Sequence, residues 1–405
     1  MRTRSAASVA RPPAATPKLA ATALGLCILA AACGGPPEAA AEKLPAAAPV
    51  QEPAILYVLD PKDLGMTSQV LAVDTVAGEI RRTYEAGRDP AMAVSPDGTR
   101  LYVASRDTAT DTLRVIDAAT GEVLQEITLR SRWMSSLPSY FPTMELSPDG
   151  RWLYILEARV TGGDAADYSV ATFDTRTGQL LPQSADVPAC GGAALVPAAR
   201  GLGFSAACHL SHDARRVAVA PHGAAEASSR THLPRDENDR TDEHGTPFDL
   251  WRLAWAVAAS GDDRMYAMTQ SGRVSVVDTA SRRVTGTEDL GVEEGSFVPF
   301  GAAELSPVGD RLFVGMGTIG DAFDRLTSDR LLVVDTASWE SGATIETSLP
   351  FQSLVVSPSG RYVYGINTEA RSIVIVDVHL GQEVGVIEGV GESPTLGAIP
   401  PAPAA

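Results

Sequence analysis

The chain has 405 residues, of which 44% are hydrophobic, and its 33 basic and 50 acidic residues give a net charge of −17. A surface this acidic argues against nucleic acids as partners and against adsorption to anionic lipid head groups. It is compatible with the docking of a basic partner or simply with solubility.

The first 33 residues have the features of a bacterial export signal. Four basic residues precede an apolar stretch at 19–32, which is too short to span a bilayer comfortably. Small residues then lead to Cys33 and resemble a lipobox. We therefore predict a lipoprotein-type signal peptide over 1–33, with Cys33 lipidated and the protein held at the periplasmic or outer surface of a membrane. Cleavage of an ordinary secretion signal and a retained anchor are the alternatives.

The segment that follows is rich in Ala, Pro and Glu. Residues 34–53 contain almost no large apolar side chains, so they cannot bury enough surface to order themselves. We predict a flexible tether over 34–53, a folded domain over 54–399 and a short tail over 400–405.

A repeated turn phrase dominates the folded domain. Ser-Pro-Asp-Gly occurs at Ser95 and Ser147, each time before a strand that contains aromatic residues. Weaker copies begin at Ser211, Ser260, Ser306 and Ser357. The steps between copies are 52, 64, 49, 46 and 51 residues. A period near 50 made of short strands and tight turns predicts a β-propeller with one copy in each blade.

A second marker, Asp followed four residues later by Gly, predicts a hairpin near the outer edge of each blade. Its clear copies begin at Asp74, Asp117, Asp174 and Asp377. The aspartate would cap the turn, and the glycine would supply the positive φ of a tight reversal. One copy is missing near residue 226, within the polar stretch 223–247.

Collecting these markers divides the domain into seven units. They span 55–88, 89–130, 140–188, 189–247, 248–291, 299–349 and 350–391. The sequence therefore predicts an all-β fold, a seven-bladed β-propeller, with six or eight blades as the alternatives. The first unit is short of strands, and we expect Ser393–Ile399 to supply the missing strand and close the ring.

Two cysteines of the domain, Cys190 and Cys208, form an isolated pair. In an exported protein such a pair predicts one disulfide, with two buried free thiols as the alternative.

Three segments carry a resemblance to a known family. They are the opening strands from Tyr57 to Asp74, the region from Asp186 through Cys190 to Cys208, and the last blade from Ile373 to Glu383. These segments resemble the heavy chain of the tryptophylquinone amine dehydrogenases, the methylamine and aromatic amine enzymes.

This resemblance implies a periplasmic propeller that holds no cofactor itself. In the family, the tryptophylquinone sits in a small cysteine-rich light chain that docks on the heavy chain and passes electrons to a redox carrier. The heavy chain lines the substrate channel, and Leu64 stands where the family has a channel phenylalanine.

Aromatic residues gather where the innermost strands are expected to begin. They are Trp133, Tyr140, Phe141, Phe297, Phe300 and Phe351. In a propeller these positions surround one mouth of the channel, so they predict a ligand pocket or an anchor for a partner. Packing between blades is the alternative.

Two further sets of polar residues are candidates for binding or chemistry. Five histidines lie among acidic residues: His209, His212, His222, His232 and His244. Their spacing matches no compact ligand pattern, so we predict no metal site and favour a partner-docking loop or an inert insertion. Glu145 and Glu304 occupy equivalent places on inner strands and are candidates for acid–base work or cation binding in the channel.

The sequence leaves two functions open, and neither includes a complete active site in this chain. One is a non-catalytic heavy-chain-like subunit of a periplasmic quinoprotein amine dehydrogenase. The other is a stand-alone lipid-anchored propeller that binds an envelope protein or glycan through its channel mouth.

Overall fold

The computed structural model describes most of the predicted propeller domain. It covers residues 50, 52, 54–62, 67–106, 111–129, 144–162, 165–182, 185–187, 193–198, 201–207, 215–221, 229–232, 255–258, 263–269, 271–281, 283–292, 296–299, 302–318, 327–342 and 344–400. For 158–162, 165–168, 185–187, Phe297, Thr318 and the described parts of 193–258, only the backbone is considered. All of them belong to one compact unit, 47–405.

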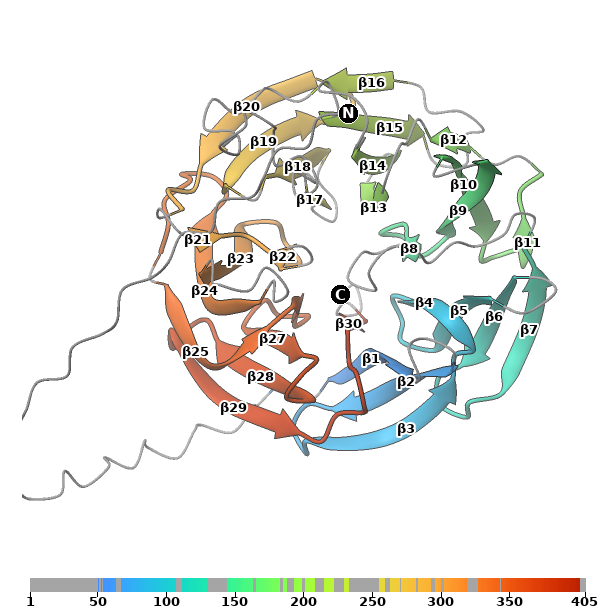
Figure 1. The fold of residues 1–405 in the computed structure, drawn as a ribbon, viewed down its shortest axis with the longest axis horizontal. Helices are drawn as coiled ribbons and strands as arrows, with labels where there is room; N and C mark the ends of the chain where they lie inside the picture. The colour runs from blue at the N-terminus through green and yellow to red at the C-terminus, as the bar shows by residue number, and fades with distance from the viewer. Residues whose placement is uncertain are drawn as a thin grey trace, which may run out of the picture. The chain divides into compact units, whose positions relative to one another are not determined.

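The described residues form strands and turns with no helix, and the strands pair antiparallel into sheets arranged around a ring (Figure 1). Blade A contains β1 (Ile55–Lys62), β2 (Thr67–Asp74), β3 (Glu79–Glu85) and β30 (Leu396–Ala398). Blade B contains β4 (Arg88–Val94), β5 (Arg100–Arg106), β6 (Thr112–Asp117) and β7 (Val123–Thr128). Blade C contains β8 (Met144–Leu146), β9 (Trp152–Gly162), β10 (Ala165–Asp174), β11 (Gln179–Leu180) and β12 (Ala185–Val187).

The second half of the ring has the same organisation. One sheet contains β13 (Ala193–Ala198), β14 (Gly201–Ala207), β15 (Arg215–Pro221) and β16 (Ser229–His232). Blade D contains β17 (Trp255–Ala258), β18 (Arg264–Met268), β19 (Arg273–Asp278) and β20 (Arg283–Asp289). Blade E contains β21 (Ser296–Phe297), β22 (Ala303–Leu305), β23 (Arg311–Thr318), β24 (Ser328–Asp335) and β25 (Ile345–Phe351). Blade F contains β26 (Ser353–Val356), β27 (Tyr362–Asn367), β28 (Ser372–Asp377) and β29 (Gln382–Glu388).

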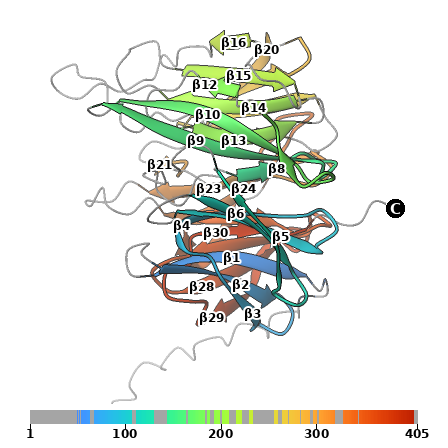
Figure 2. The ribbon, with the colours of Figure 1, turned by 90° about the vertical axis from the view of Figure 1, so that its right-hand side faces the viewer.

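The innermost strands follow one another around the centre of the ring. β4, β8, β13, β17, β22, β26 and β30 each contact the next in this order, and β1 contacts β4. Seen from the side, the sheets stand beside each other with their strands crossing the thickness of the ring (Figure 2). The middle strands are buried on both faces between neighbouring sheets, as in β28, whereas most side chains of the outermost strands β3 and β7 are exposed.

The two predicted turns form as expected. In blade B, Ser95 Oγ donates to Asp97 Oδ1 at 2.6 Å and accepts from the Arg100 N–H at 2.9 Å, while Gly98 adopts φ 68°. In blade A, Asp74 Oδ1 accepts from the N–H groups of Val76 and Ala77. Both kinds of turn lie at the same end of the blades, which we call the turn face. The opposite end is called the loop face.

Five hydrophobic cores lie between neighbouring blades. They join blade A to blade B, B to C, D to E, E to F and F back to A. Their large members are β-branched, aliphatic and aromatic residues of the middle strands, such as Tyr102, Phe313 and Ile373. Burial of these side chains stabilises each sheet against its neighbours.

The expected number of blades needs a correction. Six blades, A to F, are described with packed side chains, so the expectation of a seven-bladed propeller is wrong and the alternative of six blades describes the structure. For the sheet β13–β16, only the strand pairing is described.

The repeat itself departs from its pattern at this sheet. The weak copy at Ser211 falls between β14 and β15, the second and third strands, whereas the other copies join the first and second strands. The missing second marker also belongs to this sheet, where glycine and alanine replace many larger apolar residues.

The ring closes as predicted. β30 pairs with β1 through the register Tyr57–Ala398, Val58–Gly397 and Leu59–Leu396. Asp60, which is fully buried, strengthens this closure by accepting hydrogen bonds from Gln69 Nε2 at 2.7 Å and from the N–H groups of Glu392 and Ser393 at 2.8 and 2.6 Å.

Candidate functional site

The predicted aromatic cluster is described only in part. Leu64, Trp133, Tyr140, Phe141 and Phe300 lie outside the described residues, and Phe297 lies on β21, of which only the backbone is considered at this position. All four cysteines of the chain also lie outside them, including Cys33, Cys190 and Cys208, and so do the histidines of the 209–244 stretch except His232 on β16.

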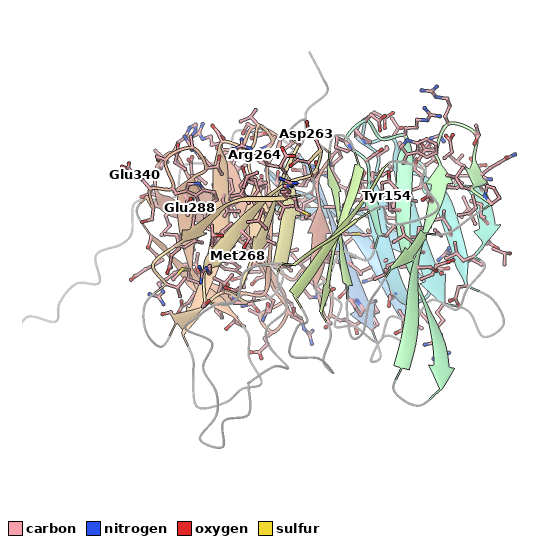
Figure 3. All side chains as sticks on the ribbon, turned by 90° about the horizontal axis from the view of Figure 1, so that it is seen from above. Tyr154, Asp263, Arg264, Met268, Glu288 and Glu340 are labelled. Atoms are coloured by element: carbon pink, nitrogen blue, oxygen red, sulfur yellow. The ribbon has the colours of Figure 1, made fainter. Side chains whose placement is uncertain are left out.

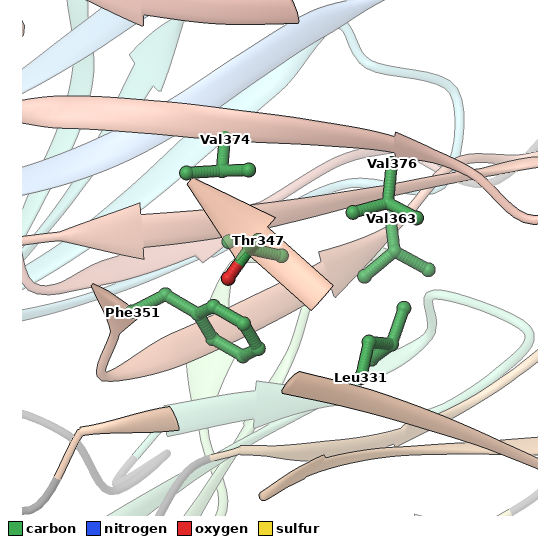
Figure 4. Close-up of a pocket in the computed structure, with 7 residues that line it drawn as sticks. Leu331, Thr347, Phe351, Val363, Val374 and Val376 are labelled. Atoms are coloured by element: carbon green, nitrogen blue, oxygen red, sulfur yellow. The ribbon is translucent and has the colours of Figure 1, made fainter. Parts of the chain in front are cut away.

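Phe351 is buried between blades E and F. Its side chain is 2% exposed, and it lines an apolar pocket with an empty volume of about 180 Å³ that has no space wide enough for a water molecule (Figure 4). A Cβ placed on Gly365 or Gly315 would lie 2.8 or 2.9 Å from the Phe351 ring. Phe351 therefore packs tightly against the backbone of two strands, which is a core position.

Glu145 and Glu304 come from inner strands on opposite sides of the ring centre, β8 and β22 (Figure 1). Glu145 pairs with Tyr154 and Glu304 with Phe313, so the two glutamates occupy the same register in their blades. In blades B and F this register holds Ala93 and Val355, which are buried. Both glutamates remain partly exposed, as expected for side chains that border the channel.

The surroundings of these two carboxyls oppose ionisation. Burial raises the pKa of Glu145 to about 8. Burial also raises the pKa of Glu304 to about 8, and the charge of Glu145 adds to this effect, whereas the Val356 N–H acts in the opposite direction. The charge of Glu145 thus reaches Glu304, although their strands lie on opposite sides of the ring centre. Near neutral pH this pair holds protons that ordinary surface glutamates have lost.

Few other charges lie on the inner strands. Within the described residues of these strands, the charged side chains besides the pair are Arg88 and Asp89, at the loop-face end of β4. Asp89 adopts φ 42° immediately before Pro90, and its carboxylate lies 3.4 Å from the guanidinium of Arg106. Glu145, Glu304 and Asp89 are therefore the carboxyl side chains that the described inner strands carry.

The described residues contain no group of three or more His, Cys, Asp and Glu side chains that could hold a metal ion. Within the same residues, no helix has the length and apolar character needed to cross a membrane.

Asp60 is a buried polar residue of the ring closure whose role was not predicted from the sequence. The only signal was an aspartate at the end of the apolar run Tyr57-Val58-Leu59, which the resemblance had included without giving it a role. Its partners Glu392 and Ser393 are 332 and 333 residues away in the chain, so the contact was not visible from the sequence.

Comparisons with known proteins support the fold. No protein-family model matches the sequence. No curated protein matches it either. Among solved structures, a functionally unknown protein from Desulfotomaculum acetoxidans is 13% identical with a TM-score of 0.56, over 85% of this chain and 98% of that one. The Cps50 (Swd1) β-propeller domain of Myceliophteria thermophila is 16% identical with a TM-score of 0.50, over 75% and 86%.

A third solved structure, hydrazine synthase of Kuenenia stuttgartiensis, is 18% identical with a TM-score of 0.48, over 71% of this chain and 76% of that one. At these identities a likeness shows the fold alone. The comparisons support a propeller but not the amine dehydrogenase heavy-chain family expected from the sequence. The chain is a β-propeller protein.

Proposed function

We propose that this chain is a non-catalytic propeller of the cell envelope that binds a cationic group in its channel. The ligand chemistry is an ammonium or guanidinium group. The observation that supports this proposal is the glutamate pair: Glu145 and Glu304 lie at the same register on inner strands of two blades, and the charge of Glu145 acts on Glu304.

The energetics of the pair favour a cation. Burial strips water from both carboxyls and raises the pKa of each to about 8, and at Glu304 the charge of Glu145 adds to this effect. A bound positive charge would remove both penalties, because it neutralises the repulsion and replaces lost water contacts.

The same values argue for binding rather than acid–base catalysis. An enzyme that uses two carboxyls as acid and base places them in different surroundings, so that their pKa values separate. Glu145 and Glu304 lie at equivalent positions and both have pKa values of about 8. These pKa values therefore do not set one carboxyl apart as the acid and the other as the base.

Of the two functions left open by the sequence, this proposal is closer to the stand-alone binding propeller than to the amine dehydrogenase subunit. The envelope location rests on the export signal in residues 1–33. A small amine and a lysine or arginine side chain of a partner protein present the same chemistry, so the test must distinguish these sources.

Calorimetric titration of the full chain with n-butylamine, and separately with trilysine peptide, tests the proposal at pH 8.5. We expect saturable binding that becomes about tenfold weaker or more in Glu145→Gln and in Glu304→Gln. Binding of both probes would indicate a small-amine site, and binding of trilysine alone would indicate a protein partner.

The matched control is Glu122→Gln, which removes an exposed carboxyl at the turn face of blade B. Its binding should equal that of the unmodified chain. Equal binding by all three variants, or no binding of either probe, would overturn the proposal.

A further inference from the structure

One arginine of blade B is partly buried without a charged partner. Arg114 lies on β6, and among the described residues its buried Nε has no hydrogen-bond partner and its guanidinium forms no ion pair. Glu126 stands directly opposite on β7, where cross-strand pairs of opposite charge commonly form, yet the two side chains do not pair. Withdrawal of a guanidinium from water is costly without a counter-charge, so this position favours an anion.

The guanidinium is turned toward the neighbouring blade A, which stands beside blade B in the ring (Figure 1). Ile116, two residues along β6, belongs to the core between blades A and B, whereas Leu113 and Val115 belong to the core between B and C. Because side chains alternate along a strand, Arg114 faces blade A. Its Nη2 lies 3.6 Å from the position of a Cβ on Gly87, in the crossing from blade A to blade B. We call this place the A–B seam.

Hydroxyl groups gather at the same crossing. A Cβ on Gly87 would lie 2.9 Å from Ser105 Oγ, and Ser105 is the register partner of Thr112, with their hydroxyl oxygens 3.5 Å apart. On the blade A side, the Ser68 carbonyl accepts a hydrogen bond from the Ala86 N–H, immediately before the glycine. The buried Ser68 Oγ has no hydrogen-bond partner within the described part of the chain. The seam therefore combines a guanidinium with hydroxyl groups, which are the donors that an oxyanion requires.

The neighbouring seam, between blades F and A, holds a carboxylate at the corresponding place. Gly391, with φ 70°, crosses from blade F to blade A as Gly87, with φ 79°, crosses from A to B. A Cβ on Gly391 would collide with the carboxyl group of Asp60, which lies beneath it. Beneath Gly87 the residue is Ser105 instead. The A–B seam thus lacks the carboxylate of its neighbour and presents a guanidinium there.

We infer that the A–B seam binds the carboxylate group of a ligand at Arg114. The carboxylate would take, relative to blade B, the place that Asp60 takes in the other seam, with the Arg114 guanidinium and the Ser105 hydroxyl as donors. Gly87, Thr112 and Arg114 are partly exposed, so a ligand can reach them. This site is separate from the channel pair and attracts the opposite charge, so it does not rest on the proposed function.

Ligand-observed saturation-transfer NMR of the full chain tests the inference. A small organic acid and the free C-terminus of a peptide present the same group, so the probes are propionate and N-acetyl-trialanine, with uncharged propionamide as the reference ligand. We expect saturable binding of a carboxylate probe and none of propionamide. Binding of propionate would assign the site to small acids, and binding of N-acetyl-trialanine alone would assign it to a peptide C-terminus.

Substitutions locate the binding. Arg114→Gln should weaken it about tenfold, because it removes the charged donor. The matched control is Arg82→Gln, which removes an exposed guanidinium between the same two blades that donates to the Thr120 carbonyl. Its binding should equal that of the unmodified chain. Equal binding by the Arg114→Gln chain, binding of propionamide as strong as that of propionate, or no binding of either carboxylate probe would overturn the inference.

Ser105→Asp gives a second readout that needs no ligand. It places a carboxylate of the protein in the seam, as Asp60 does in the other one, and should abolish binding of the probes. The same substitution should lower the thermal midpoint at least about 2 °C further in a chain that carries Arg114→Gln, because the new carboxylate then has no counter-charge. An equal change of midpoint with and without Arg114 would contradict the inference.

Discussion

Glu52 supplies the Ser357 turn with the carboxylate that this turn lacks. Its Oε2 accepts a hydrogen bond from Ser357 Oγ at 3.1 Å, and its Oε1 accepts one from the Ser359 N–H at 3.0 Å. In the Ser95 turn the corresponding acceptor is Asp97, two residues along the chain, where blade F has Ser359. A residue of the N-terminal segment thus completes a degenerate copy of the repeat.

The first prediction concerns this contact. Glu52→Ala should lower the free energy of unfolding by about 1–2 kcal/mol, because the Ser357 turn loses a charged acceptor. Adding Ser359→Asp to this variant should recover most of the loss, since the turn regains an internal carboxylate. Urea denaturation measures both changes.

The control for Glu52 is Glu79→Ala, which breaks an exposed ion pair with Arg81 and should cost about 0.5 kcal/mol or less. If the double variant were no more stable than Glu52→Ala alone, the completion of the turn would not be the role of Glu52.

The second prediction concerns Trp339, which adopts φ 58° at the place where the four clear copies of the hairpin have glycine. Its ring packs edge-on against Tyr266 of blade D, with centroids 5.8 Å apart. Trp339→Gly should relieve backbone strain yet destabilise the protein by about 1–3 kcal/mol, because the ring contact and its burial outweigh the strain.

A double-mutant cycle with Tyr266→Leu separates these effects for Trp339. We expect a coupling energy of about 0.5–1.5 kcal/mol between the two rings. A Trp339→Gly chain more stable than the original would mean that strain dominates at this position.

The third prediction concerns pH and the glutamate pair. The pKa values of Glu145 and Glu304 rise from 4.5 in the unfolded chain to about 8 in the folded one. The folded state therefore binds more protons between these values, and the contribution of the pair to stability should fall as pH rises from 4.5 to 8 and then level off.

Gln variants of the pair remove this dependence because they stay neutral. Above pH 8, Glu145→Gln and Glu304→Gln should each stabilise the protein by on the order of 1 kcal/mol, a figure reduced by the water that screens these partly exposed groups. Thermal melts between pH 5 and 9 compare the variants with Glu122→Gln. A pH dependence in the Gln variants equal to that of the unmodified chain would refute the assignment.

The fourth prediction concerns the closure residue Asp60. Asp60→Ala should cost about 2–4 kcal/mol, because the N–H groups of Glu392 and Ser393 lose a buried charged acceptor. Asp60→Asn keeps an acceptor oxygen and should cost less.

Gly391→Ala provides an independent test of the same contact. A Cβ there would meet the Asp60 carboxyl carbon at 2.4 Å, and the residue adopts φ 70°, so this variant should also be destabilised. Urea denaturation is the measurement for all three variants. Unchanged stability in Asp60→Ala would show that the pairing of β30 with β1 is sufficient for closure.

Much of the fold could be predicted because its signals are local. The Ser-Pro-Asp-Gly and Asp-x-x-x-Gly turns are held by hydrogen bonds that span two to five residues, as at Ser95 and Asp74, so each copy can be recognised by itself. The prediction failed at the sheet β13–β16, where the copy at Ser211 lies one strand later than in the other blades.

The candidate site was harder to predict from the sequence because its residues come from distant parts of the chain. Glu145 and Glu304 were candidates since they precede two copies of the same turn by the same spacing, but their interaction depends on how the ring places β8 opposite β22. Phe351 was predicted at the channel mouth because it precedes an inner strand. Its ring lies in the core instead, where Gly315 and Gly365 on two neighbouring strands leave room for it.

Figure 3 shows where labelled residues of blades D and E lie in side view. Asp263, Arg264 and Glu340 lie along one edge of the molecule in side view, while Met268, at the other end of β18, lies further from that edge (Figure 3).

The pairing of β30 with β1 sets the order in which the domain can be completed. β1 is made at the start of the domain, yet its inner neighbour, Leu396–Ala398, is made only after the strands of every other blade. Until that segment is available, the edge of β1 lacks a partner and stays open to pairing with other chains. A product truncated before Leu396 would therefore be prone to aggregation and degradation.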